Sequence, residues 1–453
     1  MTTDPPAFVP DEPDDRRTTA ASVFRVRGNV SSLTDVELRL LLDRSTSSDA
    51  AVRASTAAII ERVRATGDEA LRALATEFDG VALAGLEVPR AAWDDALAAL
   101  DPALRRAMER AVANITTAHR AFRPQATEVE TEPGVMIGRR PDPLARVGVY
   151  APGGRAAYPS SVLMGVVPAR VAGVGEVVLC SPPGPNGLPS DVVLAAAALA
   201  GADRVFAVGG AGAIAAMAYG TDSIPRVDRI VGPGNAYVAE AKLQCAGAVA
   251  IDSPAGPSEL LVLADGTADP EVVARELIAQ AEHDPRAAVV AVVVGEETAA
   301  EIEAAVERLL EDTPRRTIAT SALGAYGAIL VADDRDRAIA FANSYAAEHL
   351  LLAVAMSDAP ALLERLRGAG TVFVGETTSV AFGDYMTGAN HVLPTGGLAR
   401  AYSGLSTLDF IRWTTYQHVS REAAARLADD VGVFADSEGL SAHAAAARQW
   451  RGA

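Results

Sequence analysis

From Arg146 onward the sequence alternates short apolar runs with alanine-rich segments, and this alternation restricts the fold more than any other feature. The first four runs each lead into a glycine or proline loop and then a helical pattern: RVGVY, GEVVLC, RVFAV and RIVG. A second set follows: ELLVLAD, AAVVAVVVG, GAILVAD, LLLAV and AGTVFVG. Repeated strand–helix units build parallel sheets with helices on both faces. We therefore predict an α/β protein with two Rossmann-like domains, each built on a parallel sheet.

The remaining segments indicate how the chain divides. Residues 50–117 are helical in pattern, and the last stretch is mostly helical and polar, with no clear strand after Val374. We expect five parts: a disordered tail (1–23), an N-terminal helical segment (24–47), a discontinuous α/β domain (48–149 with 259–405), a second α/β domain (150–258) and a small helical C-terminal domain (406–453).

Charge and cysteine content exclude several classes of function. The 58 acidic and 40 basic residues give a net charge of -18, which repels phosphate backbones, so we expect no nucleic-acid partner. The apolar runs are far shorter than the ~18–20 residues that a membrane span needs, so we expect no membrane partner. Two cysteines in 453 residues cannot form a disulfide framework. So low a cysteine content fits the reducing cytosol, and we therefore predict a cytoplasmic location.

Histidine is scarce in this chain, and four of its six histidines stand in polar stretches that also carry a carboxylate. The stretches are Gln280-Ala-Glu-His283, Glu348-His349, Asp384 to His391, and Glu438 to His443. Imidazole and carboxylate groups at several points of a chain are what a metal site or an acid–base site requires. Each stretch alone has a plainer explanation, such as a satisfied buried amide, a structural pair or a solvated loop.

Two of these stretches are expected on helices. Gln280 falls on the inward stripe of a helix predicted over residues 270–284, where a buried amide needs a partner. Glu348-His349 is expected to end a helix over residues 335–349, and two bases side by side there could serve different proton transfers. The other histidines, His119 and His418, are expected to be packing or surface residues, and both cysteines to be inert buried thiols.

Three glycine-rich turns follow strands of the first set: Tyr150–Gly154, Gly209–Gly212 and Gly232–Asn235. In parallel α/β folds, ligands bind at the carboxyl ends of strands, where such loops gather. The segment Gly210-Ala-Gly212-Ala-Ile-Ala215 matches a relaxed dinucleotide fingerprint, but no acidic residue closes a second strand about 20 positions later. A tight strand-to-helix turn is the alternative reading.

Taken together, long motifs of this chain resemble the histidinol dehydrogenase family, zinc- and NAD-dependent enzymes that end histidine biosynthesis. The resemblance extends from about Phe24 to Ala453. The motifs occur in this order: VGVYAPGGRAAYPSSVLM, VGPGNAYVAEAK, IDSPAGPSE, QAEHDP, AAEHLLL, GDYMTGANHVLPTGG and EGLSAHAAA.

The resemblance implies a role for each polar stretch. One zinc ion per subunit would be bound by Gln280, His283, Asp384 and His443, and the catalytic base pair would be Glu348 and His349. Contacts to the substrate, L-histidinol, would come from Ser258, His391 and Glu438 together with His349 and the zinc ligands. The NAD positions, in the 150–258 domain, would be Tyr150, Gly212 and Asn235. Many members carry glutamine where this chain has Gly212, so a side-chain contact to the cofactor is lost there.

The resemblance also implies an assembly and a reaction. In the family, the C-terminal domain reaches into the partner subunit's site, so Glu438 and His443 would act in trans within a homodimer. L-Histidinol would be oxidised through L-histidinaldehyde to L-histidine while two NAD are reduced, with His349 accepting protons and Glu348 activating water. The alternatives are a related zinc and NAD dehydrogenase of another small amino alcohol or diol, a zinc hydrolase, and a non-catalytic binding protein.

Overall fold

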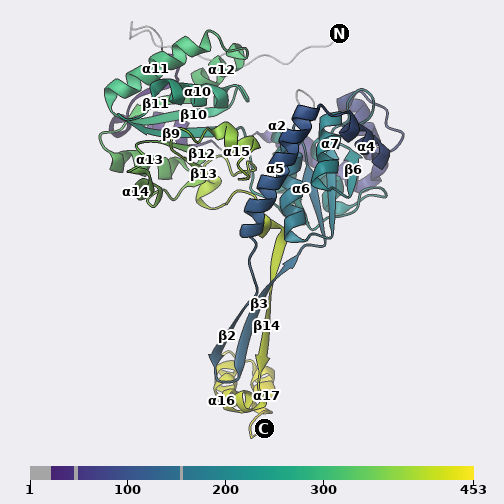
Figure 1. Ribbon diagram of the computed structural model, residues 1–453. Helices are drawn as coiled ribbons and strands as arrows, with labels where there is room; N and C mark the ends of the chain where they lie inside the picture. The colour runs from purple at the N-terminus through teal and green to yellow at the C-terminus, as the bar shows by residue number, and fades with distance from the viewer. Residues whose placement is uncertain (1–21, 45–48, 154–156, 453) are drawn as a thin grey trace.

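The computed structural model describes residues 22–44, 49–153 and 157–452, which form two sheet-based bodies and a long, narrow arm (Figure 1). Most of the expected disordered tail, residues 1–21, lies outside the described residues. Each body contains a parallel sheet, which confirms the predicted α/β class with two Rossmann-like domains. Within the described part of the chain, no helix has both the length and the apolarity needed to cross a membrane.

The six-stranded body is built on the parallel sheet β1-β11-β10-β9-β12-β13. Its strands are β1 (Val26–Asn29), β9 (Glu259–Asp265), β10 (Ala288–Val294), β11 (Gly327–Val331), β12 (Ala347–Ala353) and β13 (Ala369–Val374). Along β9, Leu260 and Val262 join one hydrophobic core, whereas Leu261 and Leu263 join another on the opposite face. Burial on both faces explains why the central strands β9 and β10 read as continuous apolar runs.

Helices cover both faces of this sheet. On one face lie α10 (Pro270–Ala281), α11 (Glu296–Leu310) and α12 (Arg316–Tyr326), and on the other lie α1 (Asp35–Leu42), α13 (Arg335–Tyr345) and α14 (Ala359–Leu363). The segment 24–47, expected to be helical, thus begins with the edge strand β1 before α1. The strand is only four residues long and contains Arg27 and Gly28, so it lacks the apolar run by which the other strands were recognised.

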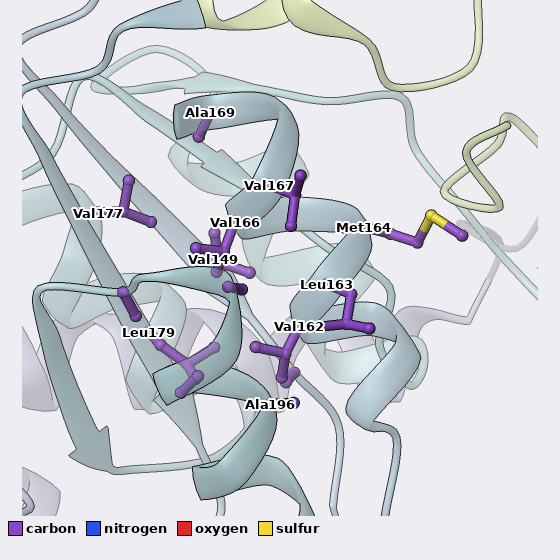
Figure 2. Close-up of a cluster of buried hydrophobic side chains, with 14 of the residues drawn as sticks. Val149, Val162, Leu163, Met164, Val166, Val167, Ala169, Val177, Leu179 and Ala196 are labelled. Carbon is purple, nitrogen blue, oxygen red and sulfur yellow. The ribbon is translucent and has the colours of Figure 1, made fainter. Parts of the chain in front are cut away.

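The five-stranded body is built on the parallel sheet β6-β5-β4-β7-β8. Its strands are β4 (Arg146–Tyr150), β5 (Glu176–Ser181), β6 (Arg204–Ala207), β7 (Arg229–Val231) and β8 (Ala250–Ile251), and its helices are α6 (Pro159–Ala172), α7 (Asp191–Ala200), α8 (Gly210–Tyr219) and α9 (Ala236–Cys245). Figure 2 shows α6 side chains such as Val162 and Val166 gathered near Val149 and Leu179 of the sheet. At Gly165, an added Cβ would lie 2.6 Å from Val149, so glycine permits this close packing.

The helices of residues 50–121 pack on the five-stranded body, which differs from the expected grouping of residues 48–149 with residues 259–405. They are α2 (Ala50–Thr66), α3 (Asp68–Leu74), α4 (Arg90–Ala99) and α5 (Pro102–Ala121). Helix α2 packs against α8 and α9, α4 against α7, and α5 against α6. Ile60 and Val63 of α2 are buried in the same core as Ile214 of α8. An apolar stripe predicts a helix but not the surface that buries it, which is why the grouping could not be read from the sequence.

The arm is a three-stranded antiparallel sheet in the order β14-β3-β2, with a helical pair at its tip (Figure 1). It contains β2 (Thr127–Glu132), β3 (Val135–Pro143), β14 (Ile411–Val419), α16 (Arg421–Ser437) and α17 (Ser441–Arg448). The expectation of a helical domain over residues 406–453 without a strand was therefore wrong at β14. That strand is largely polar and depends on cross-strand contacts: the Tyr416 ring covers Gly138, and its hydroxyl donates to Glu128 at 2.6 Å.

Candidate active site

A cavity of about 670 Å³ is lined by residues of both bodies. The five-stranded body contributes the carboxyl ends of its strands, with Tyr150 at the end of β4 and Asn235 in the loop after β7. The six-stranded body contributes the amino ends of its strands, with Ser258 just before β9 and Glu348-His349 at the start of β12. The site therefore brings together opposite edges of two parallel sheets.

The glycine loop after β7 is fixed by a buried ion pair. Gly232 has a φ of +117°, and a Cβ there would lie 2.1 Å from the Tyr150 carbonyl oxygen, so only glycine fits. Lys242 donates to the Gly232 carbonyl at 3.0 Å, and Asp252, which is ion-paired with Lys242, accepts from the Gly232 N–H at 2.7 Å. At the end of the loop, Asn235 caps α9 by accepting from two backbone N–H groups. The loop thus presents a rigid backbone to the cavity.

The two other predicted cofactor positions differ in their placement. Tyr150 lines the cavity, and its hydroxyl accepts from the Gly210 N–H at 3.1 Å. Gly212, by contrast, is buried inside α8 and is not among the residues that line the cavity. A Cβ at Gly212 would meet Leu74 at 3.0 Å and Leu71 at 3.4 Å, so this face of α8 packs against α3.

Glu348 and His349 are both buried in the cavity wall, within β12. The expected helix over residues 335–349 ends earlier, at Tyr345, because Ala346 adopts a left-handed conformation with a φ of +51°. Burial raises the pKa of Glu348 well above its usual value and lowers that of His349 to about 3. The site thus combines a neutral imidazole with a carboxyl group that resists ionisation, at 3.6 Å between His349 Nδ1 and Glu348 Oε2.

Four further predicted residues face the same cavity: Gln280, His283, Asp384 and His391. Gln280 is buried in α10 as predicted, whereas His283 lies in the turn after this helix rather than on it. Asp384 lies in the short helix α15 (Val380–Tyr385), and its backbone carbonyl is 2.9 Å from His391 Nδ1.

The surroundings of Asp384, His391 and His283 disfavour the charged forms of these side chains. Burial and the nearby Glu276 raise the pKa of Asp384 to about 6, and burial lowers the pKa of His391 to about 4. Desolvation also lowers the pKa of His283, although its ring is open to the cavity. Neutral imidazoles keep a free lone pair, which is the form that binds a metal ion.

Glu438 and His443 are not brought to this cavity within one chain. Glu438 directly follows α16 and His443 lies in α17, the two helices at the tip of the arm (Figure 1), and both residues are exposed.

The two remaining histidines and both cysteines lie where they were expected, in packed or surface positions. His119 is buried with its pKa lowered to about 4 by desolvation, and His418 is exposed on β14. Cys180 and Cys245 are free and buried, and burial raises their pKa values to about 12 and about 11.

The cavity residues fit part of a zinc site. Among residues 22–44, 49–153 and 157–452, no three histidine, cysteine or acidic side chains lie close enough together to bind one metal ion. His283 and Asp384 supply two such groups in the cavity, and the third, His443, is on the arm. The buried Gln280 side-chain nitrogen has no hydrogen-bond partner among the described residues, so this amide is available to a ligand in either of its two flipped orientations. The donors in this cavity therefore account for only part of the zinc-ligand set that the sequence predicts.

Glu259, which was not predicted as a site residue, contacts both catalytic candidates, Glu348 and His349, through its backbone. The available signal was a carboxylate at the first position of a strand whose other positions are apolar up to Asp265.

Comparisons with known proteins show which family this chain resembles. A sequence model of histidinol dehydrogenase matches residues 42–451. The histidinol dehydrogenase of Methanothermobacter thermautotrophicus is 47% identical over 392 residues, covering 86% of this chain and 91% of the relative. That of Halobacterium salinarum is 50% identical over 406 residues, covering 89% and 94%. The crystal structure of histidinol dehydrogenase from Elizabethkingia anophelis superimposes with a TM-score of 0.90 at 34% identity, covering 95% of this chain and 99% of that one. The chain belongs to the histidinol dehydrogenase family.

Proposed function

We propose that the cavity oxidises L-histidinol through L-histidinaldehyde to L-histidine, with two NAD reduced and one zinc ion bound per subunit. The observation that carries this proposal is the pairing of a neutral His349 with a protonatable Glu348 in the wall of a cavity that also holds the Tyr150 and Asn235 loops. A cytoplasmic location would suit this biosynthetic role. When bound, zinc would hold the imidazole and amine of the substrate at Gln280, His283, Asp384 and His443, and NAD would accept the hydrides.

His349 is the base for the alcohol proton. Its Nδ1 lies 3.1 Å from the Glu259 carbonyl oxygen, which can only accept, so Nδ1 carries the ring proton. The lone pair is then on Nε2, the nitrogen 3.8 Å from Asp384 Oδ1, another cavity-lining group. Burial lowers the pKa of this imidazole, so the ring is neutral at neutral pH and its Nε2 lone pair is free to take the alcohol proton, although the same burial makes it a weaker base.

Glu348 suits the later step, in which the aldehyde takes up water. Its Oε2 accepts from the Glu259 N–H at 2.7 Å, which orients the carboxyl group and favours its ionised form. A carboxylate with a raised pKa is a stronger base than an exposed one once it is ionised. Positive charge in the cavity, from the cofactor or the substrate, would promote that ionisation. Glu348 would then remove a proton from the water that forms the aldehyde hydrate.

The stoichiometry of the reaction tests the function. We expect two NADH formed per histidinol consumed, with activity abolished by a chelator and restored by zinc. The His283→Asn variant should retain less zinc after dialysis than the wild type, because a ligand is lost. A ratio of one would mean that the reaction stops at the aldehyde. No NADH would favour the hydrolase or the binding protein, and faster turnover of simple diols would favour the related dehydrogenase.

Replacing Glu348 separates the two oxidations. In Glu348→Gln, the amide cannot accept the proton of water, so the second oxidation should slow by about 10²- to 10⁴-fold while the first is affected less. Single-turnover absorbance at 340 nm, started from histidinol and separately from histidinaldehyde, measures both steps. Equal losses in the two would contradict the assignment of water activation to Glu348.

The arm suggests how Glu438 and His443 could take part. We propose a homodimer in which the arm of each subunit reaches the cavity of the other. The tip of the arm also exposes Val433 and Phe434 on α16, two large apolar side chains that a partner surface would cover.

A further inference from the structure

The backbone of Glu259 contacts both catalytic side chains. Glu259 begins β9, which pairs in parallel with β12, so its peptide groups lie beside the start of that strand. Its N–H donates to Glu348 Oε2 at 2.7 Å, and its carbonyl oxygen lies 3.1 Å from His349 Nδ1. One residue therefore sets both the orientation of the carboxyl group and the tautomer of the imidazole.

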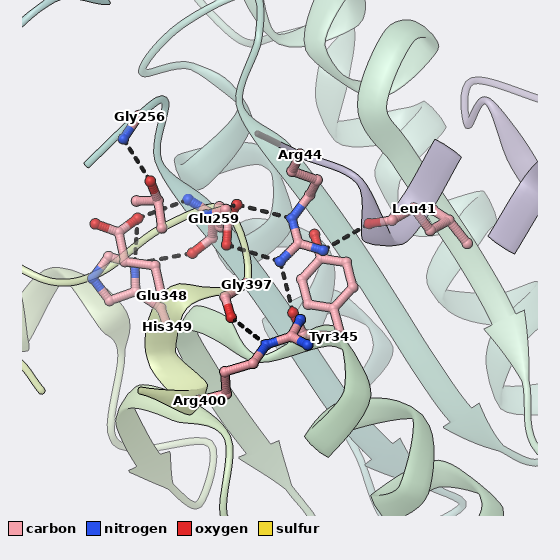
Figure 3. Close-up of polar contacts among 11 residues, drawn as sticks. Leu41, Arg44, Gly256, Glu259, Tyr345, Glu348, His349, Gly397 and Arg400 are labelled. Carbon is pink, nitrogen blue, oxygen red and sulfur yellow. Dashed lines mark hydrogen bonds and ion pairs between the residues drawn. The ribbon is translucent and has the colours of Figure 1, made fainter. Parts of the chain in front are cut away.

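The side chain of Glu259 is held in turn by Arg44, which follows α1 (Figure 3). Arg44 Nε donates to Glu259 Oε1 at 2.8 Å and Arg44 Nη2 to Oε2 at 3.2 Å, which is the two-point geometry of an arginine–carboxylate pair. Both side chains are buried, with exposed fractions of 7% for Arg44 and 3% for Glu259. Glu259 Oε1 also accepts from the Gly396 N–H at 2.8 Å.

Arg44 also contacts the chain immediately before β12. Its Nη2 donates to the Tyr345 carbonyl at 2.7 Å, and its guanidinium carbon lies 3.5 Å from the centre of the Tyr345 ring. Tyr345 ends α13, three residues before Glu348. Arg44 Nη1 donates to the Leu41 carbonyl at 2.6 Å, which ties the guanidinium to its own segment. A single guanidinium group thus links the start of β9 to the entry into β12 (Figure 3).

A buried ion pair is a costly way to stabilise a fold, because apolar residues of similar volume often serve as well or better. The two-point contact of such a pair fixes the relative positions of the segments that carry it. Position matters for catalysis, because displacing a catalytic group by about 1 Å can lower the reaction rate by about 100-fold. We propose that Arg44 and Glu259 are positioning residues that hold His349 in its Nδ1–H tautomer and orient Glu348. This inference rests on the proposed roles of Glu348 and His349.

The test compares Glu259→Gln and Arg44→Met with Asp265→Asn in the full-length protein. Asp265 is a matched control because it is also buried and paired with an arginine, Arg335 at 2.6 Å, but lies at the opposite end of β9. We expect each of the first two variants to lower kcat by about 10- to 100-fold with little change in the KM for histidinol or NAD. The control should retain wild-type kcat.

Two further measurements separate positioning from simple stability. The double variant Arg44→Met/Glu259→Gln removes both charges and should recover thermal stability relative to the single variants without recovering kcat, because the two-point contact is still missing. In ¹⁵N-histidine NMR spectra of the protein without zinc or NAD, the His349 signal should show Nδ1 protonated in the wild type and a mixture of tautomers in Arg44→Met.

Two results would overturn the proposal: a wild-type kcat in Arg44→Met and Glu259→Gln at temperatures where they are folded, or a His349 tautomer that is unchanged in Arg44→Met. The NMR measurement does not depend on turnover. If the wild type fails to oxidise histidinol but the tautomer shifts as expected, the proposed function fails while the positioning contact stands.

Discussion

The His349→Gln variant is expected to lose both oxidations, with kcat reduced by about 10²- to 10⁴-fold for histidinol and for histidinaldehyde alike. Glutamine can still donate an N–H to the Glu259 carbonyl, so the contact at Nδ1 has a substitute, but it has no lone pair able to accept a proton in place of Nε2. Stopped-flow measurement of NADH with each substrate tests the expectation. A loss confined to one substrate would show that His349 serves only one of the two steps.

Zinc content and melting temperature are the controls for this variant. Neither should change much, because His349 is not among the proposed zinc ligands and glutamine is of similar size. The pH dependence of the wild type gives an independent check. Since burial holds the pKa of His349 at about 3, its ring is unprotonated well below neutral pH. A fall in kcat between pH 7 and pH 5 that disappeared in His349→Gln would contradict this assignment.

The elements that the sequence predicted well are those with a strong local signal. The apolar runs of β9 to β12 are buried on both faces, and Gln280 is buried because it shares the stripe of Val273 and Leu277. The position of Glu348-His349 was missed for a local reason as well. The stripe of α13 continues through Tyr345, and nothing in the residue type of Ala346 indicates the left-handed φ that ends the helix.

The arrangement of the site depends on contacts that a sequence does not record. Ligands in parallel sheets are expected at carboxyl ends of strands, and Tyr150 obeys that rule, but Glu348-His349 lies at the amino end of β12. The strand β14 was missed because it pairs with β3, whose residues are distant in sequence, and it carries few apolar side chains. Arg44 and Glu259 are likewise 215 positions apart. Such pairings arise only when segments that are distant in sequence fold against one another.

Two inactive variants are expected to restore activity when their subunits are mixed. The first is His349→Gln, which damages the cavity of its own subunit but leaves its arm intact. The second is His443→Ala, which damages the arm but leaves the cavity intact. If each arm completes the partner's cavity, a mixed dimer contains one site in which both parts are intact. Random association makes about half of the dimers mixed, so co-expression should recover roughly a quarter of the wild-type kcat per site.

The control for this experiment is co-expression of His349→Gln with Glu348→Gln. Both substitutions lie in the cavity, so every site in their mixed dimers has a defective wall and the oxidation of histidinol to histidine should not recover. The separately purified variants mixed without subunit exchange should also remain inactive. Recovery in the first mixture alone requires that His443 and His349 of one working site belong to different subunits. Failure to recover, in a mixture whose heterodimers are verified by mass spectrometry, would place the arm's contribution within its own chain. The exposed position of His443 at the arm tip, outside the cavity of its own chain, favours the first outcome.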